Sequence, residues 1–440
     1  MIKFLKGLCS WFPFLGLCAK HSDMTSLDRD TANDYDESVP EIWENGVTED
    51  SYKSAFFGDA DMGSAGSGKP IVKKDDFTRY KHGDVIHIQT ISKLFGAGQT
   101  GENQLIGNEE KNATATYSFT VSRKRHAVAL TEEVEREVNF DALDLAGRQL
   151  ADWEAVRRDD MIFNELINGS ASPRNLYGGT ATSVDALAAG CQLGTNEIDK
   201  TKLVLSRLGA QPIDTPFGYA YALVIDELSE YELKGDNRWN NANYYAAPRS
   251  YTENALWQGR MGKAGRMVGI WNGVAVYVLN SVRSGAVIMG SYVRPEAVLT
   301  SNYTAGGVTL TVAASSAINA TKYFPSTGKV TLYDGTNREE VAYSATSANT
   351  ITITAAANSF ASGSLVTYYD SVSRCVAYGA DAVACGYGQT PRMITDTRDY
   401  GMINGVGISV VDGAKLIEDS ANAVPNCVIL NVKAENPTTI

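Results

Sequence analysis

The chain has little of what a metal centre needs. Its 440 residues include only four histidines and six cysteines, with no Cys-x-x-Cys pair. Zinc sites take cysteine and histidine ligands at short spacings, so we expect neither a metal nor a cofactor. Dispersed thiols of this kind are typical of reduced cysteines in a cytosolic setting. They are Cys9, Cys18, Cys191, Cys375, Cys385 and Cys427.

Positive charge is also scarce, since the formal net charge is −12. A protein that grips nucleic acid neutralises phosphates with lysine and arginine, so we expect no general nucleic-acid binder. An acidic protein can still lie near nucleic acid without binding it.

Long apolar runs are absent. Residues 7–17 resemble a short signal peptide, but the run is too short to span a bilayer and contains Pro13. Met24 offers an alternative start, which would make residues 1–23 an upstream extension. We expect no membrane segment.

Catalytic groups do not converge in the sequence. Three of the four histidines, His82, His87 and His126, fall on one predicted ribbon, so no Ser-His-Asp triad assembles. Asp159 and Asp160 are adjacent on a predicted helix and point about 100° apart, which favours a solvated helix face or an ion pair. We expect that the chain is not an enzyme.

One glycine-rich segment nearly matches a phosphate-binding loop. Residues 63–70 read GSAGSGKP, with Pro70 where that loop needs a Ser or Thr hydroxyl. No buried strand is predicted before it. We interpret the segment as a flexible linker within an acidic, then glycine- and serine-rich arm.

The most informative stretch is a long predicted helix over residues 139–168. Asn139 is a good N-cap, and apolar residues recur at spacings of three, four or seven. At about 1.5 Å per residue the helix is roughly 43 Å long, the length of a spine along a sheet. We expect Trp153 to lie buried beneath it, against that sheet.

Ahead of this helix, residues 82–95 and 114–130 show strand-like alternation around a long loop. Two arms of about twelve residues reach roughly 40 Å, and an isolated ribbon cannot bury its own faces. Another part of the chain or another subunit must cover it, and the charge layout favours another subunit. Acidic residues lie at the tip and basic ones toward the base: Glu102, Glu109 and Glu110, then Arg123, Lys124 and Arg125.

A change of composition marks residues 298–370. Threonine, serine and alanine dominate, and five short alternating strands are predicted. We expect a small, independent, outward-facing β domain inserted into a host domain, with Arg294 and Arg374 close together on the surface. After it, residues 374–387 are predicted as a helix and residues 405–411 as a strand. Before it, the sequence predicts a helix at residues 198–208, a buried strand at residues 219–225 and a hairpin turn at Asn272-Gly273.

Several of these segments resemble a known family. They read GDVIHIQTISKLFGAGQTGENQLIGNEEKNATATYSFTVSRKRHAVALT, LADWEAVRRDDMIFNELING, ENALWQGRMGKAGRMVGIWNGVAVYVLNSV, YGADAVACGYG and DYGMINGVGIS, in that order. Together they cover most of residues 83–169, 239–282 and 374–414, and they resemble the major capsid protein family of the N-four-type tailed phages. The glycine-rich tip ending in Gly-Asn-Glu-Glu, combined with the helix around Trp153, is a specific pattern.

The resemblance implies an α+β, Hong Kong-97-like capsid fold. Its parts would be an N-terminal extension (1–23), an N-terminal arm (24–81), an extended two-stranded loop (82–130), a first part of the peripheral and axial domains (131–297), the inserted β domain (298–370) and a second part (371–440). The implied function is the major capsid protein of a tailed double-stranded DNA phage. It would be found in the virion after assembly in the host bacterial cytoplasm.

The implied partners are copies of the same chain in hexameric and pentameric capsomers, with scaffold, portal and decoration proteins. Packaged double-stranded DNA would be enclosed without specific binding. For assembly we expect the acidic tip to meet basic surface on a neighbour, with Arg157 and Arg158 as the best candidates. A tail or fibre adhesin that carries a β module remains the alternative.

Overall fold

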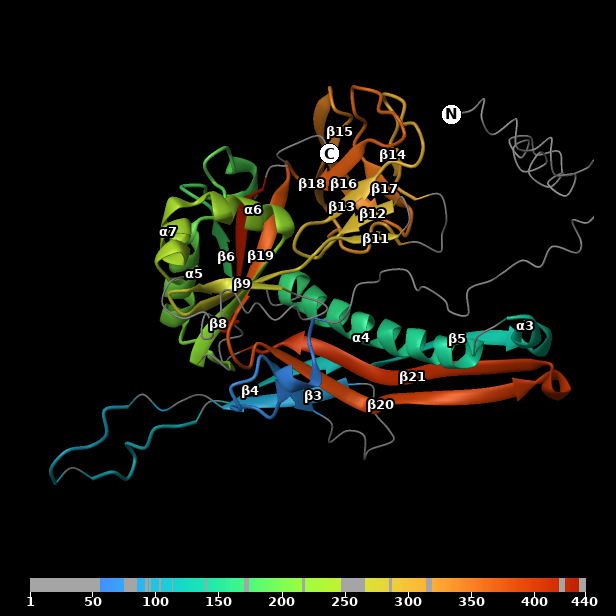
Figure 1. The fold of residues 1–440 in the computed structure, drawn as a ribbon. Helices are drawn as coiled ribbons and strands as arrows, with labels where there is room; N and C mark the ends of the chain where they lie inside the picture. Colours follow the sequence, from blue (N-terminus) through green and yellow to red (C-terminus); the bar gives the residue numbers. More distant parts are fainter. Residues whose placement is uncertain are drawn as a thin grey trace, which may run out of the picture. The chain divides into compact units, whose positions relative to one another are not determined.

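The computed structural model describes residues 56–74, 85–91, 94, 96–102, 104–112, 114–138, 141–169, 174–215, 218–246, 266–284, 287–313, 319–418 and 424–434. All of them lie in one compact unit, residues 50–440 (Figure 1). The predicted residues 1–23 and most of the N-terminal arm lie outside the described residues.

A single long helix, α4 (Ala142–Asn168), runs along a sheet, as predicted (Figure 1). It begins three residues later than predicted, because the Asp141 carboxylate caps it by accepting the backbone N–H of Asp144 at 3.0 Å. The predicted cap, Asn139, lies outside the described residues. Gly169 ends the helix, and its N–H donates to the Glu165 carbonyl.

The sheet under α4 is five-stranded, in the order β1-β2-β20-β21-β5. Val406 and Ile408 of β21 pack against Leu150 of the helix. Since strand side chains alternate, every second residue of β21 faces α4 and the others face away. The strands are β1 (Met62–Gly63), β2 (Ile71–Lys74), β20 (Val383–Arg398), β21 (Ile403–Leu416) and β5 (Ser122–Thr131).

The predicted helix over residues 374–387 is wrong. These residues lie in β19 (Val372–Tyr378) and the start of β20, with a turn between them in which Asp381 has φ 54°. Every residue of β19 is buried, so neither face of the strand meets solvent and the alternation of polar and apolar residues that identifies a strand is lost. The expected strand at residues 405–411 is confirmed within β21.

The predicted ribbon is shorter than expected. Its arms are β3 (Val85–Ile91) and β4 (Thr114–Thr120), which pair antiparallel from Val85–Thr120 to Ile91–Thr114. After Val121 the chain enters β5, which pairs with β21 instead. Residues 122–130 therefore belong to the long sheet, where Val128 packs with Leu150 and Trp153 of α4.

This chain itself covers the base of the ribbon. Ile86, Tyr117 and Phe119 are buried against Ala384 of β20. The expectation that another subunit covers the whole ribbon is therefore wrong for its base, and it stays a prediction for the tip.

A second, seven-stranded sheet carries much of the main core. It has the order β6-β22-β19-β8-β10-β9, with β7 beside β8. The predicted hairpin turn is confirmed, since Asn272 and Gly273 join β9 to β10 with φ of 47° and 77°. The predicted helix at 198–208 and strand at 219–225 are also confirmed within α5 and β8.

The elements around this sheet are short. They are β6 (Arg174–Tyr177), β7 (Ile213–Thr215), β8 (Gly218–Ile225), β9 (Arg266–Trp271), β10 (Val274–Val278), β22 (Cys427–Lys433), α5 (Thr195–Leu208), α6 (Glu227–Gly235) and α7 (Asn237–Ala246). Elsewhere lie α3 (Glu132–Glu137), η3 (Asp59–Asp61), η5 (Val184–Ala186), η6 (Asp399–Gly401) and the pair β11 (Val282–Ser284) and β12 (Val287–Gly290).

The threonine-rich region forms a six-stranded antiparallel sheet with a core of its own. Its strands are β13 (Glu296–Val298), β14 (Thr309–Thr311), β15 (Gly328–Tyr333), β16 (Arg338–Thr346), β17 (Thr350–Ile353) and β18 (Leu365–Tyr368). Tyr323 of this region joins the main core, and Lys322 forms an ion pair with Asp160 of α4.

The two ends of this region lie side by side, but not on the surface. The backbone N–H of Arg374 donates to the Val293 carbonyl at 2.8 Å. Arg294 and Arg374 are only 4% and 6% exposed, so their expected surface position is wrong. Arg374 reaches Asn168 and the Tyr292 carbonyl and lies over the Tyr368 ring, so the junction between this region and the rest of the chain is a packed one.

We expect Gly413→Ala to lower the free energy of unfolding by about 1–3 kcal/mol, the usual penalty for overpacking. A Cβ at Gly413 would lie 2.4 Å from the Thr120 carbonyl oxygen, where the ribbon base crosses β21 and the backbone cannot yield. Urea unfolding of the unassembled subunit measures the change. Gly405→Ala is the matched control on the same strand, since its nearest neighbour is 3.5 Å away. Equal effects at both positions would contradict the close crossing.

Candidate functional site

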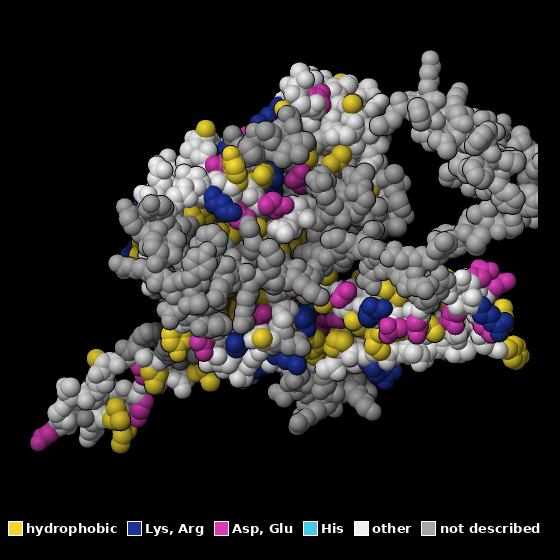
Figure 2. All heavy atoms as spheres, in the orientation of Figure 1, with side chains coloured by type: hydrophobic (Ala, Val, Ile, Leu, Met, Phe, Trp, Pro, Cys, Tyr) yellow, Lys and Arg dark blue, Asp and Glu magenta, His cyan; other side chains and the backbone are white. Residues whose placement is uncertain are grey.

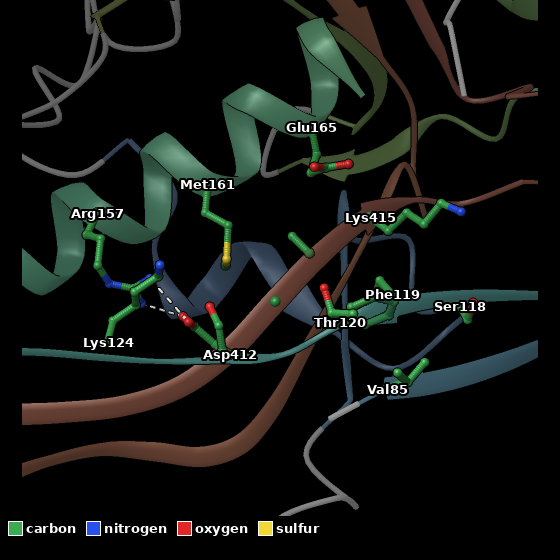
Figure 3. Close-up of a pocket in the computed structure, with 13 residues that line it drawn as sticks. Val85, Ser118, Phe119, Thr120, Lys124, Arg157, Met161, Glu165, Asp412 and Lys415 are labelled. Atoms are coloured by element: carbon green, nitrogen blue, oxygen red, sulfur yellow. Dashed lines mark hydrogen bonds and ion pairs between the residues drawn. The ribbon is translucent and has the colours of Figure 1, made fainter. Parts of the chain in front are cut away.

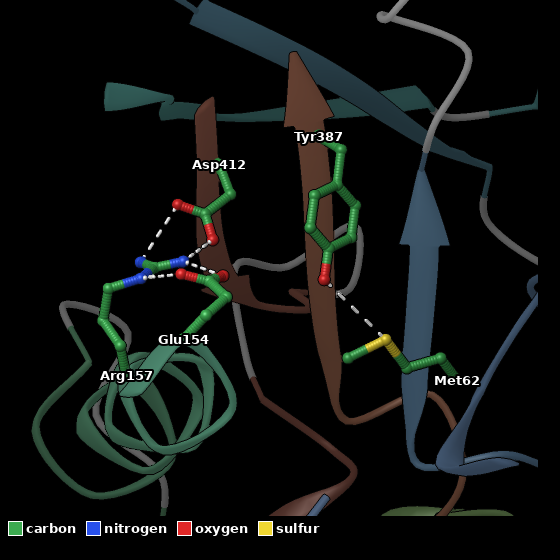
Figure 4. Close-up of polar contacts among 5 residues, drawn as sticks. All are labelled: Met62, Glu154, Arg157, Tyr387 and Asp412. Atoms are coloured by element: carbon green, nitrogen blue, oxygen red, sulfur yellow. Dashed lines mark hydrogen bonds and ion pairs between the residues drawn. The ribbon is translucent and has the colours of Figure 1, made fainter. Parts of the chain in front are cut away.

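A buried ion cluster joins the spine helix α4 to the long sheet. The Arg157 guanidinium donates to Glu154 at 2.7 and 2.8 Å and to both carboxylate oxygens of Asp412 on β21 (Figure 4). Burial alone lowers the pKa of Arg157, but the two carboxylates outweigh it and hold this pKa above its ordinary value. Arg157 is therefore a permanent cation committed within its own chain.

Arg158 and Asp159 hold the segment that precedes β1. The Asp159 carboxylate accepts the backbone N–H groups of Phe56 and Phe57, and Arg158 donates to the Phe57 carbonyl at 3.0 Å. Both aromatic rings contact Phe163 of α4. Neither arginine is thus presented as the free basic surface that we expected, so they are poor partners for an acidic tip from another copy.

The acidic pair on α4, Asp159 and Asp160, is buried. The expectation of a solvated helix face is therefore wrong for this pair. Asp159 is fully buried and bonds backbone, and Asp160 forms the expected ion pair, with Lys322. Both carboxylates bond to other parts of this chain, Asp159 to the segment before β1 and Asp160 to the threonine-rich region.

The glycine-rich segment at 63–70 is an ordered connection between β1 and β2, not a linker. Gly66 and Gly68 have φ of 77° and 73°, and the Gly66 N–H donates to the Asp381 carboxylate at 2.8 Å. A carboxylate occupies the place where a phosphate-binding loop would receive an anion. The negative charge of Asp381 at this place does not fit a phosphate-binding loop.

A pocket of about 650 Å³ lies where the ribbon base meets the spine helix (Figure 3). Arg157, Met161 and Glu165 of α4 line one side, and Asp412 and Lys415 of β21 line another. Burial raises the pKa of Glu165, and the nearby Lys415 opposes that rise. Lys124 of β5 also lines this pocket, which places it on the helix side of the sheet.

The ribbon tip carries the three predicted acidic residues on the surface. Glu102, Glu109 and Glu110 are exposed, and the last two accept backbone N–H groups of Gly107 and Gly96. Leu105 and Ile106 beside them are 60% and 85% exposed. Figure 2 shows acidic and hydrophobic side chains side by side on this segment, the loop drawn in cyan in Figure 1.

The basic residues expected at the ribbon base lie on β5 instead. Arg123 and Arg125 are exposed and lie on the face of the sheet opposite α4, since Lys124 between them faces the helix. They were expected toward the base of the ribbon, and the structure pairs their strand with β21 of the long sheet.

Trp153 is partly buried, not fully buried as expected. It packs with Leu143 and Val128 against the cluster that joins α4 to β21, and its ring lies 4.9 Å from that of His126. The helix face is the predicted one. His126 therefore belongs to β5 and not to the ribbon.

Within the part of the chain that the structure describes, no group of three or more His, Cys, Asp or Glu side chains is arranged to hold a metal. The described cysteines, Cys191, Cys375, Cys385 and Cys427, are free and buried. Burial raises the pKa of Cys385 to about 11 and that of Cys427 to about 12, so these thiols stay protonated and unreactive. None of the described helices is long and apolar enough to cross a membrane.

Asp412 was not among the predicted site residues, although it pairs with Arg157. A single carboxylate in the apolar run VVDGA was the available signal for Asp412, because a buried acid needs a partner.

We expect Arg157→Met to lower the free energy of unfolding by about 3–5 kcal/mol, because it leaves two buried carboxylates without their shared cation. Urea unfolding of the subunit measures the loss. Adding Glu154→Gln and Asp412→Asn to the same chain should restore part of the stability. The control is Arg148→Gln, which removes an exposed cation paired with Asp144 at 3.3 Å. A loss at Arg148 as large as that at Arg157 would contradict the special role of the cluster.

Trp153→Ala should lower the free energy of unfolding by about 2 kcal/mol, less than for a fully buried tryptophan, because part of the ring already meets solvent. Trp153→Phe keeps most of the apolar contact and should cost less than half as much. The same urea experiment compares the two. A negligible effect of Trp153→Ala would show that the ring does not stabilise the helix on the sheet.

Comparison with known proteins agrees with this architecture. Residues 25–194 match a family model described as phage capsid protein. No curated protein matches the chain.

Among solved structures, the capsid of Ralstonia phage GP4 matches with 16% identity and a TM-score of 0.58, covering 91% of this chain and 97% of that one. The capsid of Cyanophage Pam1 matches with 17% identity and a TM-score of 0.58, covering 93% and 99%. The acid-stable capsid of Helicobacter pylori bacteriophage KHP30 matches with 13% identity and a TM-score of 0.56, covering 92% and 98%.

These matches span the spine helix, the long sheet and the regions that follow, and not an isolated motif. The chain therefore has the Hong Kong-97-like fold of phage capsid proteins, and its residues 25–194 carry the sequence pattern of a phage capsid protein family.

Proposed function

We propose that this chain is the major capsid protein of a tailed double-stranded DNA phage, and that many copies assemble into the icosahedral shell around the genome. The observation that carries the proposal is the extent of the structural match, which covers 91–93% of this chain and 97–99% of three phage capsid chains. A tail or fibre adhesin is not favoured, because such a protein would share the β module and not the spine helix and long sheet.

The finer assignment is to the N-four-type capsid family, supported by the sequence segments around the ribbon tip and Trp153. Copies would form hexameric and pentameric capsomers, with scaffold, portal and decoration proteins as further partners. Assembly would take place in the host bacterial cytoplasm, and the product is the virion shell. The role is structural and not enzymatic.

The six-stranded region fits an inserted domain that adds to the shell surface. Its separate core supports this reading. Its packed junction, through Arg374 and Lys322, indicates a domain held rigidly to the shell and not one on a flexible tether.

The ribbon tip supports a role in assembly. Leu105 and Ile106 lie exposed on it beside three exposed carboxylates, and adjoining apolar and charged side chains of this kind suit a contact with another copy. The net charge of −12 suits a shell that encloses DNA with weak contact, because strong positive charge would hold the packaged genome.

Removing residues 96–112 should leave the subunit folded and abolish closed shells, because the tip makes no part of the buried clusters while the base of the ribbon stays in place. The variant is expressed beside the wild type. Circular dichroism checks its fold, and sedimentation with negative-stain electron microscopy checks assembly. Closed shells of wild-type size from the variant would contradict the role of the tip. A wild-type chain that forms no shell or capsomer with its assembly partners present would overturn the proposed function itself.

A further inference from the structure

The threonine-rich region of residues 298–370, which we call the module, places its positive charge against the rest of the chain. Its sequence contains three cations, Lys322, Lys329 and Arg338. Each of them forms an ion pair with a carboxylate, and two of these carboxylates belong to elements outside the module. The third is Asp370, the last residue of the module, which also pairs with Lys433 of β22 at 3.1 Å.

One contact of the module is on the C-terminal half of the spine helix α4. Lys322 pairs with Asp160, whose side chain is only 8% exposed, so solvent screens this pair little. The next residue, Tyr323, is buried in the main core and packs edge-on against Tyr292, with ring centroids 4.7 Å apart. The module therefore holds the helix by an ion pair and an aromatic contact side by side.

The other contact is on the seven-stranded sheet. Lys329 of β15 pairs with Asp185 of η5 at 2.5 Å, and Tyr369 packs in the apolar cluster of the same loop. This loop is tied to β22, since the Lys433 N–H donates to the Cys191 carbonyl at 3.1 Å. A displacement of the module would therefore pull on the loop and on the strand that holds it.

The chain leaves the module through a turn of unusual backbone conformation. Tyr369 and Ser371 have φ of 47° and 55°, values that residues with a side chain rarely adopt. Such a conformation persists only where surrounding contacts hold it. Between these two residues, Asp370 pairs with Arg338 of the module and with Lys433 of β22. The ion pairs thus hold the exit of the module in one conformation.

The two contacts reach parts of the chain that belong to different sheets. The spine helix α4 lies on the long sheet, whereas β22 and the loop bonded to it belong to the seven-stranded sheet. The module lies beside both, near the C-terminal end of α4 (Figure 1). One packed body in contact with both sides restricts their motion relative to each other.

We propose that the module is an intramolecular clamp that fixes the orientation of the spine helix relative to the seven-stranded sheet. It binds the helix through Lys322 and Tyr323, and the sheet through Lys329 and Asp370. Its own hydrophobic core holds these two sets of contacts at a fixed separation. Without such a brace, packed elements can slide against each other by small steps. This function belongs to the single chain and does not depend on the shell proposed above.

The test measures the distance between the helix and the sheet in the unassembled full-length subunit. Spin labels are attached at Ala151→Cys on α4 and Ser206→Cys on α5, which are both exposed positions. Helix α5 reports on the seven-stranded sheet because it packs in the same core. Cys9→Ser and Cys18→Ser restrict labelling to these two sites, since the described cysteines are buried. Pulsed electron paramagnetic resonance gives the distribution of the distance.

Three variants are compared with the wild type. The clamp variant carries Lys322→Gln, Lys329→Gln and Arg338→Gln, with Asp160→Asn so that the buried carboxylate is not left without its cation. A milder variant carries only Lys329→Gln and Arg338→Gln, whose side chains are partly exposed. The matched control removes three exposed cations, each from an i,i+4 ion pair far from the module in sequence: Arg136→Gln, Arg148→Gln and Lys234→Gln.

We expect one narrow distance distribution in the wild type and in the control, and a distribution about twofold broader or more in the clamp variant. The milder variant should broaden it less. Salt at about 1 M should broaden the wild-type distribution in the same direction, because it screens the exposed pairs. Circular dichroism shows whether each variant has folded.

The proposal is overturned if the folded clamp variant keeps the wild-type distribution, or if the control broadens it as much. If the clamp variant does not fold, the milder variant decides, and an unchanged distribution in it overturns the proposal. Failure of the wild type to form shells would count against the proposed function and would leave this result as it stands.

Discussion

The contact between α4 and β21 is the constraint on which the rest of the described structure depends. An apolar stripe on the helix packs on alternate residues of the strand. At the end of this contact the Arg157 guanidinium donates hydrogen bonds to the buried carboxylates of Glu154 and Asp412. A buried cation without partners would be costly, so the helix is held where Arg157 reaches Asp412 of β21, and Glu154 of the same helix completes the cluster. This single register also decides which residues of the long sheet face the helix and which face away.

At Val121 the chain changes from pairing with β3 to pairing with β21, the strand that packs against α4. Strand β4 pairs with β3, and the next residues leave it to pair with β21. The crossing needs bare backbone on the long sheet, which Gly386 and Gly413 provide. The ribbon is thus anchored at its base and free at its tip, an arrangement that suits contact with another copy.

The long sheet has two faces with different chemistry. The face toward α4 packs Val406 and Ile408 against the helix and carries one buried ion cluster, whereas the other face carries glycines at 405 and 407 and exposed arginines. An edge strand such as β5 is protected from unwanted pairing by charges along it, and Arg123 and Arg125 serve that purpose as well.

The sequence by itself determined the local elements with strong periodicity or turn chemistry. The spine helix, the Asn272–Gly273 hairpin and the threonine-rich strands could be read from spacing and composition, because those signals arise within a few neighbouring residues. The family resemblance added the arrangement of these parts. Only the tertiary structure decided that residues 374–387 form strands, that residues 122–131 leave the ribbon, and that Arg157 is paired inside the chain. Each of these three outcomes depends on contacts with residues that are distant in the sequence. In the case of residues 374–387, burial on both faces of the strand removes the alternation of polar and apolar residues by which a strand is recognised.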